Sequence, residues 1–299
     1  MNTSPKGSRA KADKRLGVKV AQPSELMQFL LTQLPNKSRN NIKSLLTRCQ
    51  VSVDNQVVSR FDYPLQIGQE VVVNWTRVEE QPKGLKIIYE DPDIVVIEKQ
   101  AGMLSIATAK EKELTAYSML SEHVKKSDPK NRIFVVHRLD RDTSGVMLFA
   151  KSEKIKQALQ NNWKDVVLER SYNVVAEGKV TKEQGTVTSW LKEAKSLIMY
   201  SSRTPNGGQK AVTHYRVLKK NDSYSLLEVH LETGRKNQIR VHMQDLGHSI
   251  IGDKKYGAAK NPISRLGLHA RVLAFSHPVT GKKMRFESEI PREFLRLFT

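Results

Sequence analysis

The sequence predicts an α+β protein of two units, a small α/β module and a larger domain with a mixed, largely antiparallel sheet. Its 299 residues are enough for two domains of roughly 100–200 residues each. Hydrophobic residues make up 38% and charged residues 27% of the chain, which is typical of a globular protein. At about residue 86 the apolar pattern changes from helix-rich to a succession of short alternating strands. This change places a domain boundary near that residue.

The first unit is expected at residues 16–76, after a polar, basic and flexible tail at residues 1–15. Apolar residues at helical spacing follow Ser24, and Ser38 is a suitable N-cap for a second helix. A turn at Asp54 separates two short apolar runs, which predicts a hairpin. The two helices, the hairpin and a final strand are expected at residues 24–34, 38–50, 51–58 and 71–73.

The second unit is expected at residues 86–299, after a linker at residues 77–85. Strands are expected at residues 86–89, 94–98, 134–136, 146–150, 171–177, 186–191, 213–219 and 224–231. Helices are expected at residues 115–126, 155–167 and 236–246. Because helices are mixed irregularly with hairpin-linked strands, the pattern favours an α+β domain over a regular α/β one.

The charge of the chain indicates a polyanionic partner. The formal net charge is +19, and such an excess attracts nucleic acid through counterion release and long-range steering. We expect no membrane partner, because the sequence has no apolar run near ~20 residues and no strongly basic amphipathic helix. A single cysteine excludes an internal disulfide, and the N-terminus has no apolar centre typical of a secretory signal. We therefore expect a cytoplasmic protein.

The densest polar cluster is the segment HRLDRDTSG at residues 137–145, which lies between two apolar strands. A loop of charged and small residues between buried strands is a common place for a functional site. Taken alone, an aspartate beside two arginines also fits a structural ion pair.

The whole segment resembles the signature of the RluA family of pseudouridine synthases. Four further segments resemble motifs of that family: IVVIEKQAGML at 94–104, LETGRKNQIRVH at 231–242, GHSIIGDKKYG at 247–257 and LGLHARVLAFSHP at 266–278. The first unit is similar to the S4 RNA-binding module, through its Ser38-Arg39 helix start and the segments VSVDNQVV and LQIGQEVVV. Together the resemblances cover at least four fifths of the chain. They imply an S4-like RNA-binding domain followed by a pseudouridine synthase catalytic domain.

The resemblance assigns roles to particular residues. It implies that Asp140 is the catalytic carboxylate, Tyr172 the active-site tyrosine and Arg240 the arginine that pairs with the aspartate. Arg138 matches the arginine that enters the RNA stack where the flipped base was. Further basic or polar residues are expected to contact RNA: His137, Arg141, Arg39, Lys43, Arg48, Arg235 and Lys236.

The chemistry implied by the resemblance suits these residue types. Uracil is detached from C1′, rotated and reattached through C5 without net redox change or hydrolysis, so we expect no cofactor. The eight histidines show no metal-ligand spacing with cysteine, so we expect no metal. A guanidinium near Asp140 would keep the carboxylate charged. Whether Asp140 attacks the sugar, attacks the base or takes a sugar proton stays open, and Tyr172 can stack on uracil or exchange the C5 proton. The uridine must first be extruded, at a cost of a few kcal/mol.

Two other functions stay open from the sequence. One is a catalytically inactive RNA-binding factor in ribosome assembly. The other is a glycosidic hydrolase, which needs a second carboxylate for which Asp142 is the nearby candidate. The expected substrate is a structured RNA, ribosomal RNA first and transfer RNA second, and the protein is expected to be a monomer.

Three of the family's usual motifs are altered in this chain. Gln100 stands where a proline is usual, Lys236-Asn237 where Thr-His is usual, and Arg170 where a lysine is usual. We expect none of them to touch the catalytic candidates Asp140, Tyr172 and Arg240. We therefore expect these departures to change RNA contacts and substrate choice rather than activity.

Overall fold

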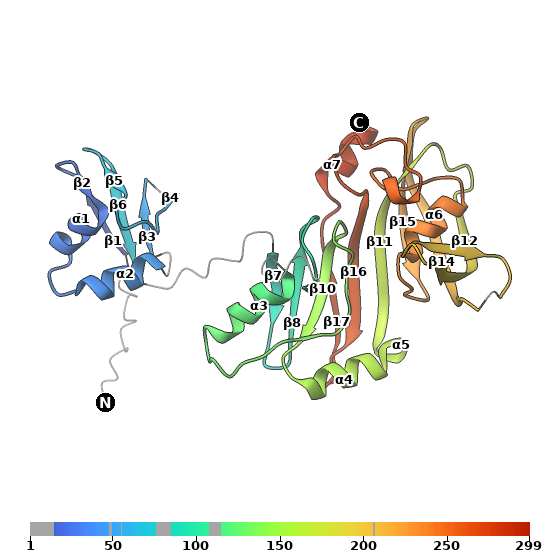
Figure 1. Cartoon of the computed structure of the whole chain (residues 1–299), viewed down its shortest axis with the longest axis horizontal. Coiled ribbons are helices and arrows are strands. Elements are labelled where there is room, and N and C mark those ends of the chain that lie inside the picture. The colour runs from blue at the N-terminus through green and yellow to red at the C-terminus, as the bar shows by residue number, and fades with distance from the viewer. Residues whose placement is uncertain (1–14, 48–49, 55, 76–84, 108–114, 206) are drawn as a thin grey trace, which may run out of the picture. The chain divides into compact units, whose positions relative to one another are not determined.

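The computed structural model describes residues 15–47, 50–54, 56–75, 85–107, 115–205 and 207–299 (Figure 1). The chain divides into two compact units, residues 1–80, here the N-terminal unit, and residues 81–299, here the C-terminal unit. The expected tail lies outside the described residues except Arg15, which begins a strand. The expected linker also lies outside them except Leu85, which begins a strand and is buried.

The N-terminal unit contains a four-stranded antiparallel sheet with strand order β1-β6-β3-β4. Its strands and helices are β1 (Arg15–Lys19), α1 (Leu26–Gln33), α2 (Arg39–Thr47), β3 (Val51–Val53), β4 (Gln56–Val57) and β6 (Glu70–Asn74). A separate two-stranded pairing joins β2 (Ser24–Glu25) to β5 (Pro64–Leu65). One cluster of buried side chains, including Leu30 of α1, Ile42 of α2 and Val71 of β6, forms the core. The expected helices, hairpin and final strand are present, and β1 was not expected.

The C-terminal unit is built on an 11-stranded sheet whose main path is β13-β12-β14-β15-β11-β16-β10-β8-β7. The strands are β7 (Leu85–Glu90), β8 (Ile94–Lys99), β9 (Phe134–Val135), β10 (Ser144–Ala150), β11 (Val167–Glu177), β12 (Gln184–Glu193), β13 (Met199–Ser202), β14 (Gln209–Lys220), β15 (Tyr224–Leu231), β16 (Leu268–Ser276) and β17 (Lys283–Glu287). Only β10 and β16 pair in parallel among the described strands, which confirms the predicted mixed, largely antiparallel sheet.

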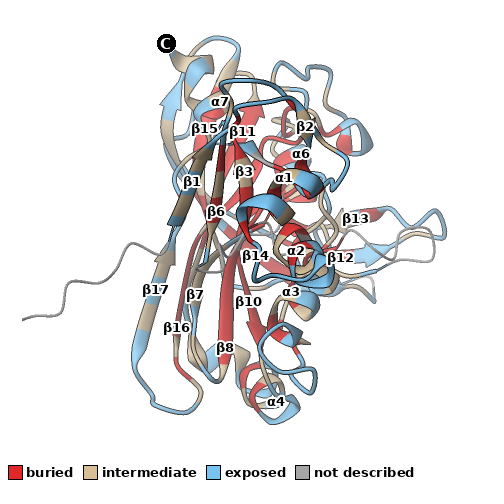
Figure 2. Ribbon diagram, turned by 90° about the vertical axis from the view of Figure 1, so that its left-hand side faces the viewer, coloured by how far each residue is buried: buried red, intermediate tan, exposed pale blue. Residues whose placement is uncertain are grey.

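Strand β16 was not expected because its pattern does not alternate. Seven of its nine residues are buried, as they are in strands covered on both faces. The same holds for β10, in which all seven residues are buried (Figure 2). A strand of this kind is hard to recognise because periodicity shows only where one face meets water.

Alternate residues of β10 face two different cores. Met147 and Phe149 pack with α3 (Ala116–Lys125), whereas Leu148 and its neighbours pack with α4 (Glu153–Asn161). The two helices therefore cover opposite faces of the sheet at β10. In the described part of the chain, no helix is long and apolar enough to cross a membrane.

Helix α6 (Gln238–Asp245) packs against the sheet through Ile239 and Met243, in a cluster with Val174 of β11. Tyr172 lies two residues earlier on the same face of β11 and contacts both this cluster and the α3 cluster. Leu139 of the polar loop at residues 137–143 packs in the α3 cluster. The fold therefore places the loop and the start of α6 on one face of the sheet.

Candidate active site

A cleft of about 950 Å³ lies on this face of the C-terminal unit. It is lined by all the residues of this unit that the sequence analysis proposed for the site: His137, Arg138, Asp140, Arg141, Tyr172, Arg235, Lys236 and Arg240. These residues come from a loop, a central strand and the start of a helix that are far apart in the sequence. The C-terminal unit thus brings the proposed site residues together.

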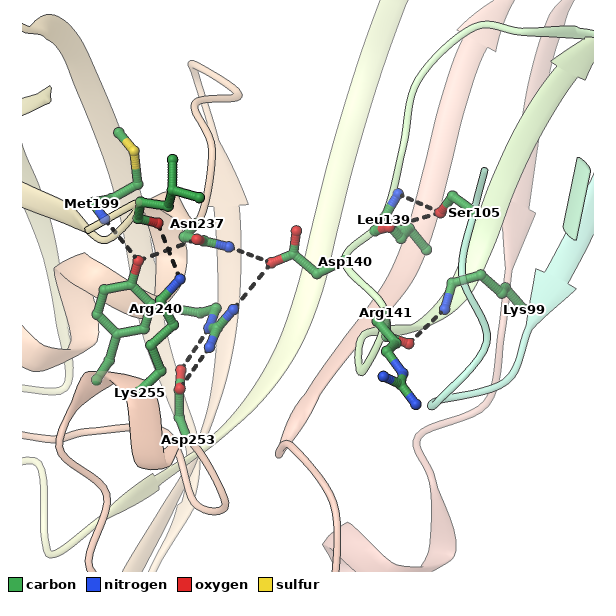
Figure 3. Close-up of polar contacts among 12 residues, drawn as sticks. Lys99, Ser105, Leu139, Asp140, Arg141, Met199, Asn237, Arg240, Asp253 and Lys255 are labelled. Atoms are coloured by element: carbon green, nitrogen blue, oxygen red, sulfur yellow. Dashed lines mark hydrogen bonds and ion pairs between the residues drawn. The ribbon is translucent and has the colours of Figure 1, made fainter. Parts of the chain in front are cut away.

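Asp140 lies on the loop between β9 and β10, and its two neighbours are fixed by hydrogen bonds. Ser105 Oγ donates to the carbonyl of Leu139 (2.7 Å) and accepts from the amide N–H of Leu139 (3.2 Å). The carbonyl of Arg141 accepts from the amide N–H of Gly102 (3.0 Å) and from Lys99 Nζ (3.1 Å). The backbone at Asp140 is therefore held from both sides (Figure 3).

Lys99, at the end of β8, is a fully buried support for this loop. Its ammonium donates to three carbonyls, those of Gln100 (3.0 Å), Met103 (2.8 Å) and Arg141 (3.1 Å). Burial lowers the pKa of Lys99 to about 8. An ammonium with three acceptors has its donors satisfied, so it connects the first motif to the loop that carries Asp140.

The end of the loop is fixed on the other face of the sheet. Ser144 Oγ accepts from Arg265 Nη2 (2.6 Å) and lies 2.8 Å from Nδ1 of the buried His269. Gly145 follows with φ of 116°, and a Cβ there would lie 2.0 Å from the carbonyl oxygen of Ala270. A side chain at position 145 would therefore clash with the backbone of β16, and glycine allows the two strands to pair there.

The carboxylate of Asp140 receives its closest hydrogen bond from Asn237, whose Nδ2 lies 2.6 Å from Oδ2 (Figure 3). The expectation that the Lys236-Asn237 departure does not touch the catalytic candidates is therefore wrong. It failed because 97 residues separate Asn237 from Asp140, and only the packing of α6 beside the loop brings them together.

Arg240 contacts Asp140 only at 3.5 Å, through Nη1. Its Nε and Nη2 atoms bind Asp253 in a bidentate pair at 2.6 and 2.7 Å, and the side chain of Asp253 is 1% exposed. The guanidinium is thus shared, and its shorter contacts go to the buried carboxylate. The expected pairing of Arg240 with Asp140 is present, but it is the weaker of its two contacts.

Among the described residues, Asp140 is the one carboxylate that lines the cleft. Its side chain is 40% exposed, and its Oδ1 points away from Asn237 and Arg240 (Figure 3). Asp142, the second carboxylate that a hydrolase would need, does not line the cleft, and Asp253 is occupied by Arg240. The geometry therefore disfavours hydrolysis by two carboxylates.

Tyr172 lies on β11 and lines the cleft. Next to it, a bulge in the pairing of β11 with β16 leaves Arg271 of β16 without a paired residue on β11. Burial raises the pKa of Tyr172; the nearby Arg170 lowers it and the charge of Asp140 raises it. The phenol is therefore neutral at physiological pH. This favours stacking or proton donation by the ring and its hydroxyl over action as a base.

His137, Trp163 and Arg170 form one wall of the cleft. The rings of His137 and Trp163 are 5.2 Å apart, and the guanidinium of Arg170 lies over Trp163 at 5.9 Å. Desolvation and the charge of Arg170 lower the pKa of His137 to about 3, so its ring is neutral. Because Nε2 of His137 accepts from the amide N–H of Leu148 (3.1 Å), its ring proton is on Nδ1.

The basic residues proposed to contact RNA lie in both units. Arg138, Arg141 and Arg235 are exposed at the cleft, and Lys236 forms an ion pair with Glu193, which offsets its charge. In the N-terminal unit, Arg39 and Lys43 are exposed residues of α2. The remaining candidate, Arg48, lies outside the described residues.

In the described part of the chain, Asp91, Asp93 and His277 are close enough together to hold a metal ion. Asp91 already accepts from the amide N–H groups of Asp93 and Ile94 (both 2.8 Å) and from Tyr89 (2.9 Å), and it contacts His277 Nε2 at 3.1 Å. These bonds describe a structural turn between β7 and β8, and we assign no metal to it.

The model of the RNA pseudouridylate synthase family matches residues 93–245. The chain is 37% identical over 241 residues to the uncharacterized RNA pseudouridine synthase YjbO of Bacillus subtilis (strain 168), which covers 79% of this chain and 85% of that protein. It is 31% identical over 291 residues to the ribosomal large subunit pseudouridine synthase D of Pasteurella multocida (strain Pm70), with 91% and 89% covered. The solved structure of human RNA pseudouridylate synthase domain containing 4 matches with a TM-score of 0.58 and 25% identity, over 70% of this chain and 90% of that chain.

The sheet, the cleft and these similarities define an enzyme that modifies RNA. The chain belongs to the RNA pseudouridylate synthase family and is an RNA pseudouridine synthase, an isomerase. This confirms the family predicted from residues 137–145. The similarity of the N-terminal unit to the S4 module stays a prediction.

Sequence reasoning missed four residues that support the site: Lys99, Asn237, Asp253 and Tyr256. Asp253 and Tyr256 lie in the GDKKYG segment, which was recognised as a motif but given no role. A carboxylate and an aromatic hydroxyl between two glycines were the available signal. Nothing in the local pattern indicated that they would meet Arg240 and Asn237.

Proposed function

We propose that this enzyme converts uridines of large-subunit ribosomal RNA into pseudouridine, with Asp140 as its catalytic carboxylate. The observation that carries the proposal is the position of Asp140 in the cleft, where Oδ2 is held by Asn237 and Arg240 while Oδ1 is left for a substrate. The net charge of +19 supports RNA as the partner, and the relative from Pasteurella multocida is named for the large ribosomal subunit.

The cleft supports the reaction in three ways. A uridine extruded from the RNA can enter between Asp140 and Tyr172, with the neutral tyrosine ring available to stack on the uracil. The exposed Arg138 can fill the gap left by the flipped base, since a planar guanidinium stacks on neighbouring bases. Asp140 then acts on the sugar or the base. The bond between N1 and C1′ breaks, the uracil rotates and C5 bonds to C1′; C5 loses a proton and N1 gains one, so the product is an isomer of the substrate.

The proposal is tested with Asp140→Asn and with Asp142→Asn as a matched control, which removes the same charge two residues further along the loop. Each protein is incubated with ribosomal RNA from cells that lack this enzyme, and pseudouridine is mapped at every position. We expect Asp140→Asn to form no product and to bind RNA within about twofold of the unmodified protein, since the electrostatic contacts remain. Asp142→Asn is expected to stay active.

Three outcomes count against the proposal. Product formation by Asp140→Asn would remove the role of Asp140. If pseudouridine forms only when transfer RNA is supplied, the proposed substrate class is wrong, whereas the proposed chemistry still holds. Binding of ribosomal RNA without any product from the unmodified protein would favour the inactive assembly factor.

A further inference from the structure

Asn237 is a closer partner of the catalytic carboxylate than Arg240. Its Nδ2 lies 2.6 Å from Asp140 Oδ2, whereas Arg240 Nη1 lies 3.5 Å from the same oxygen. Arg240 directs two other nitrogens to the buried Asp253. The bidentate side of the guanidinium is therefore occupied, and the orientation of Asp140 depends mainly on the neutral amide.

The orientation of the Asn237 amide is fixed by Tyr256, which binds the amide oxygen and whose side chain is almost fully buried. The amide N–H of Met199 donates to the hydroxyl oxygen of Tyr256 (3.1 Å), and that hydroxyl donates to Asn237 Oδ1 (3.1 Å). Burial raises the pKa of Tyr256, so the hydroxyl keeps its proton and remains a donor. Because Oδ1 accepts from tyrosine, Nδ2 must face Asp140, which as a carboxylate can only accept (Figure 3).

The backbone conformation at position 237 also favours asparagine. Asn237 has φ of 52° and ψ of 22°, and it is the N-cap residue of α6. Asparagine adopts this left-handed conformation more readily than most residues. Arg240 follows three residues later, so the two side chains leave the same face of the helix and both reach Asp140.

We propose that Asn237 is a positioning residue for pseudouridine formation: its amide, oriented by Tyr256, holds Oδ2 of Asp140 so that Oδ1 faces the bound uridine. This inference rests on the proposed role of Asp140. A neutral amide fixes the carboxylate without cancelling its charge, whereas a bidentate ion pair would occupy both oxygens. Arg240 instead fixes the start of α6 through Asp253.

The test measures the single-turnover rate of pseudouridine formation at saturating RNA, and separately the RNA dissociation constant. Asn237→Gly removes the amide but accepts the left-handed backbone, and we expect its rate to fall roughly 10- to 100-fold, the value of one hydrogen bond to a charged group. Asn237→Asp retains the acceptor for Tyr256 but repels Asp140, and its rate should fall further. The RNA dissociation constants should stay within about twofold.

Two more variants and one control separate positioning from a merely structural role. Tyr256→Phe retains the ring but frees the amide to rotate, so its rate should fall as well, while Tyr200→Phe at an exposed tyrosine should leave the rate unchanged. Asn237→His supplies a ring N–H donor and tolerates the same backbone, so it should recover most of the rate.

Several results would overturn the inference. One is a rate for Asn237→Gly within twofold of the rate of the unmodified enzyme. Another is equal loss of rate in Asn237→Gly and Asn237→His, which indicates a structural role only. If Asp140→Asn is inactive while Asn237→Gly is fully active, the inference alone fails. If Asp140→Asn remains active, the proposed function fails and the inference with it.

Discussion

Three histidines of the C-terminal unit are kept neutral by removal from water. Burial is the main cause that lowers the pKa of His137 to about 3 and those of His242 and His269 to about 4. Each ring is held by neutral partners: His242, for example, lies 2.7 Å from Thr213 Oγ1 and 2.9 Å from Ser189 Oγ. The protonation of these three residues therefore affects how the free energy of unfolding changes with pH.

We predict that the stability of the C-terminal unit falls as the pH is lowered from about 6.5 to 4. Each histidine has a lower pKa in the folded state than in the unfolded state, so the unfolded state binds more protons in this window. The contribution is fully present above the unfolded pKa and is lost as the pH falls toward the folded one. With three such groups, the free energy of unfolding should fall by up to about 4 kcal/mol per pH unit.

Urea unfolding at several pH values, followed by tryptophan fluorescence, measures this slope. His242→Gln should reduce the proton uptake on unfolding by about one, because one of the three groups is removed. An uptake below one proton between pH 5 and 6 in the unmodified protein would contradict the prediction.

At the scale of elements, the active-site loop ends at the parallel pairing of β10 with β16. Strand β10 meets β16 at Ser144 and Gly145, opposite His269 and Ala270. One residue further along β16, the bulge at Arg271 lies beside Tyr172 on β11. Bulges near active sites commonly redirect a side chain, so β16 aligns both the loop that carries Asp140 and the strand that carries Tyr172.

We predict that Gly145→Ala lowers the free energy of unfolding by about 2–6 kcal/mol and reduces activity. The new Cβ would lie 2.0 Å from the carbonyl oxygen of Ala270, and φ of 116° is strained for alanine. Denaturant unfolding and a turnover assay measure the two effects.

Gly281→Ala is the matched control for this change. Gly281 also has a positive φ, of 69°, but nothing lies within 4 Å of its added Cβ. Its loss of stability should be about 1 kcal/mol, with no change in activity. Equal losses for the two variants would show that the approach of β10 to β16 does not matter.

For the whole molecule, the excess of positive charge extends over both units. Exposed basic residues lie on α2 of the N-terminal unit, Arg39 and Lys43 among them, and others surround the cleft of the C-terminal unit. Since the formal net charge is +19, we expect the RNA affinity to come mainly from contacts with phosphate groups.

We predict that the RNA dissociation constant rises steeply with salt, linearly in a double-logarithmic plot. The double variant Arg39→Ala/Lys43→Ala should reduce the slope by up to about 2. Each phosphate contact that is lost lowers by about one the number of counterions released when RNA binds. Lys282→Ala/Lys283→Ala, which removes the same charge near the exposed strand β17, is the control and should change the slope less. A flat dependence for the unmodified protein would contradict a phosphate-based affinity.

The local sequence was enough to predict the α+β class, eight strands of the larger sheet and the loop that carries Asp140. Alternation, turn residues and the HRLDRDTSG segment are short-range signals, and each is readable within about ten residues. Strands β10 and β16 illustrate the limit, since burial on both faces removes the alternation, and the second of them was not predicted.

The partners of the site residues needed the folded chain. Asn237 meets Asp140 across 97 residues, Lys99 meets Arg141 across 42, and Arg240 prefers Asp253 to Asp140. These contacts follow from the register of the sheet and from the packing of α6 against it, which depend on the whole core at once. The residue types in a motif indicate which chemical groups are available for the reaction. The hydrogen-bond partners of those groups depend on which distant segments the core brings into contact.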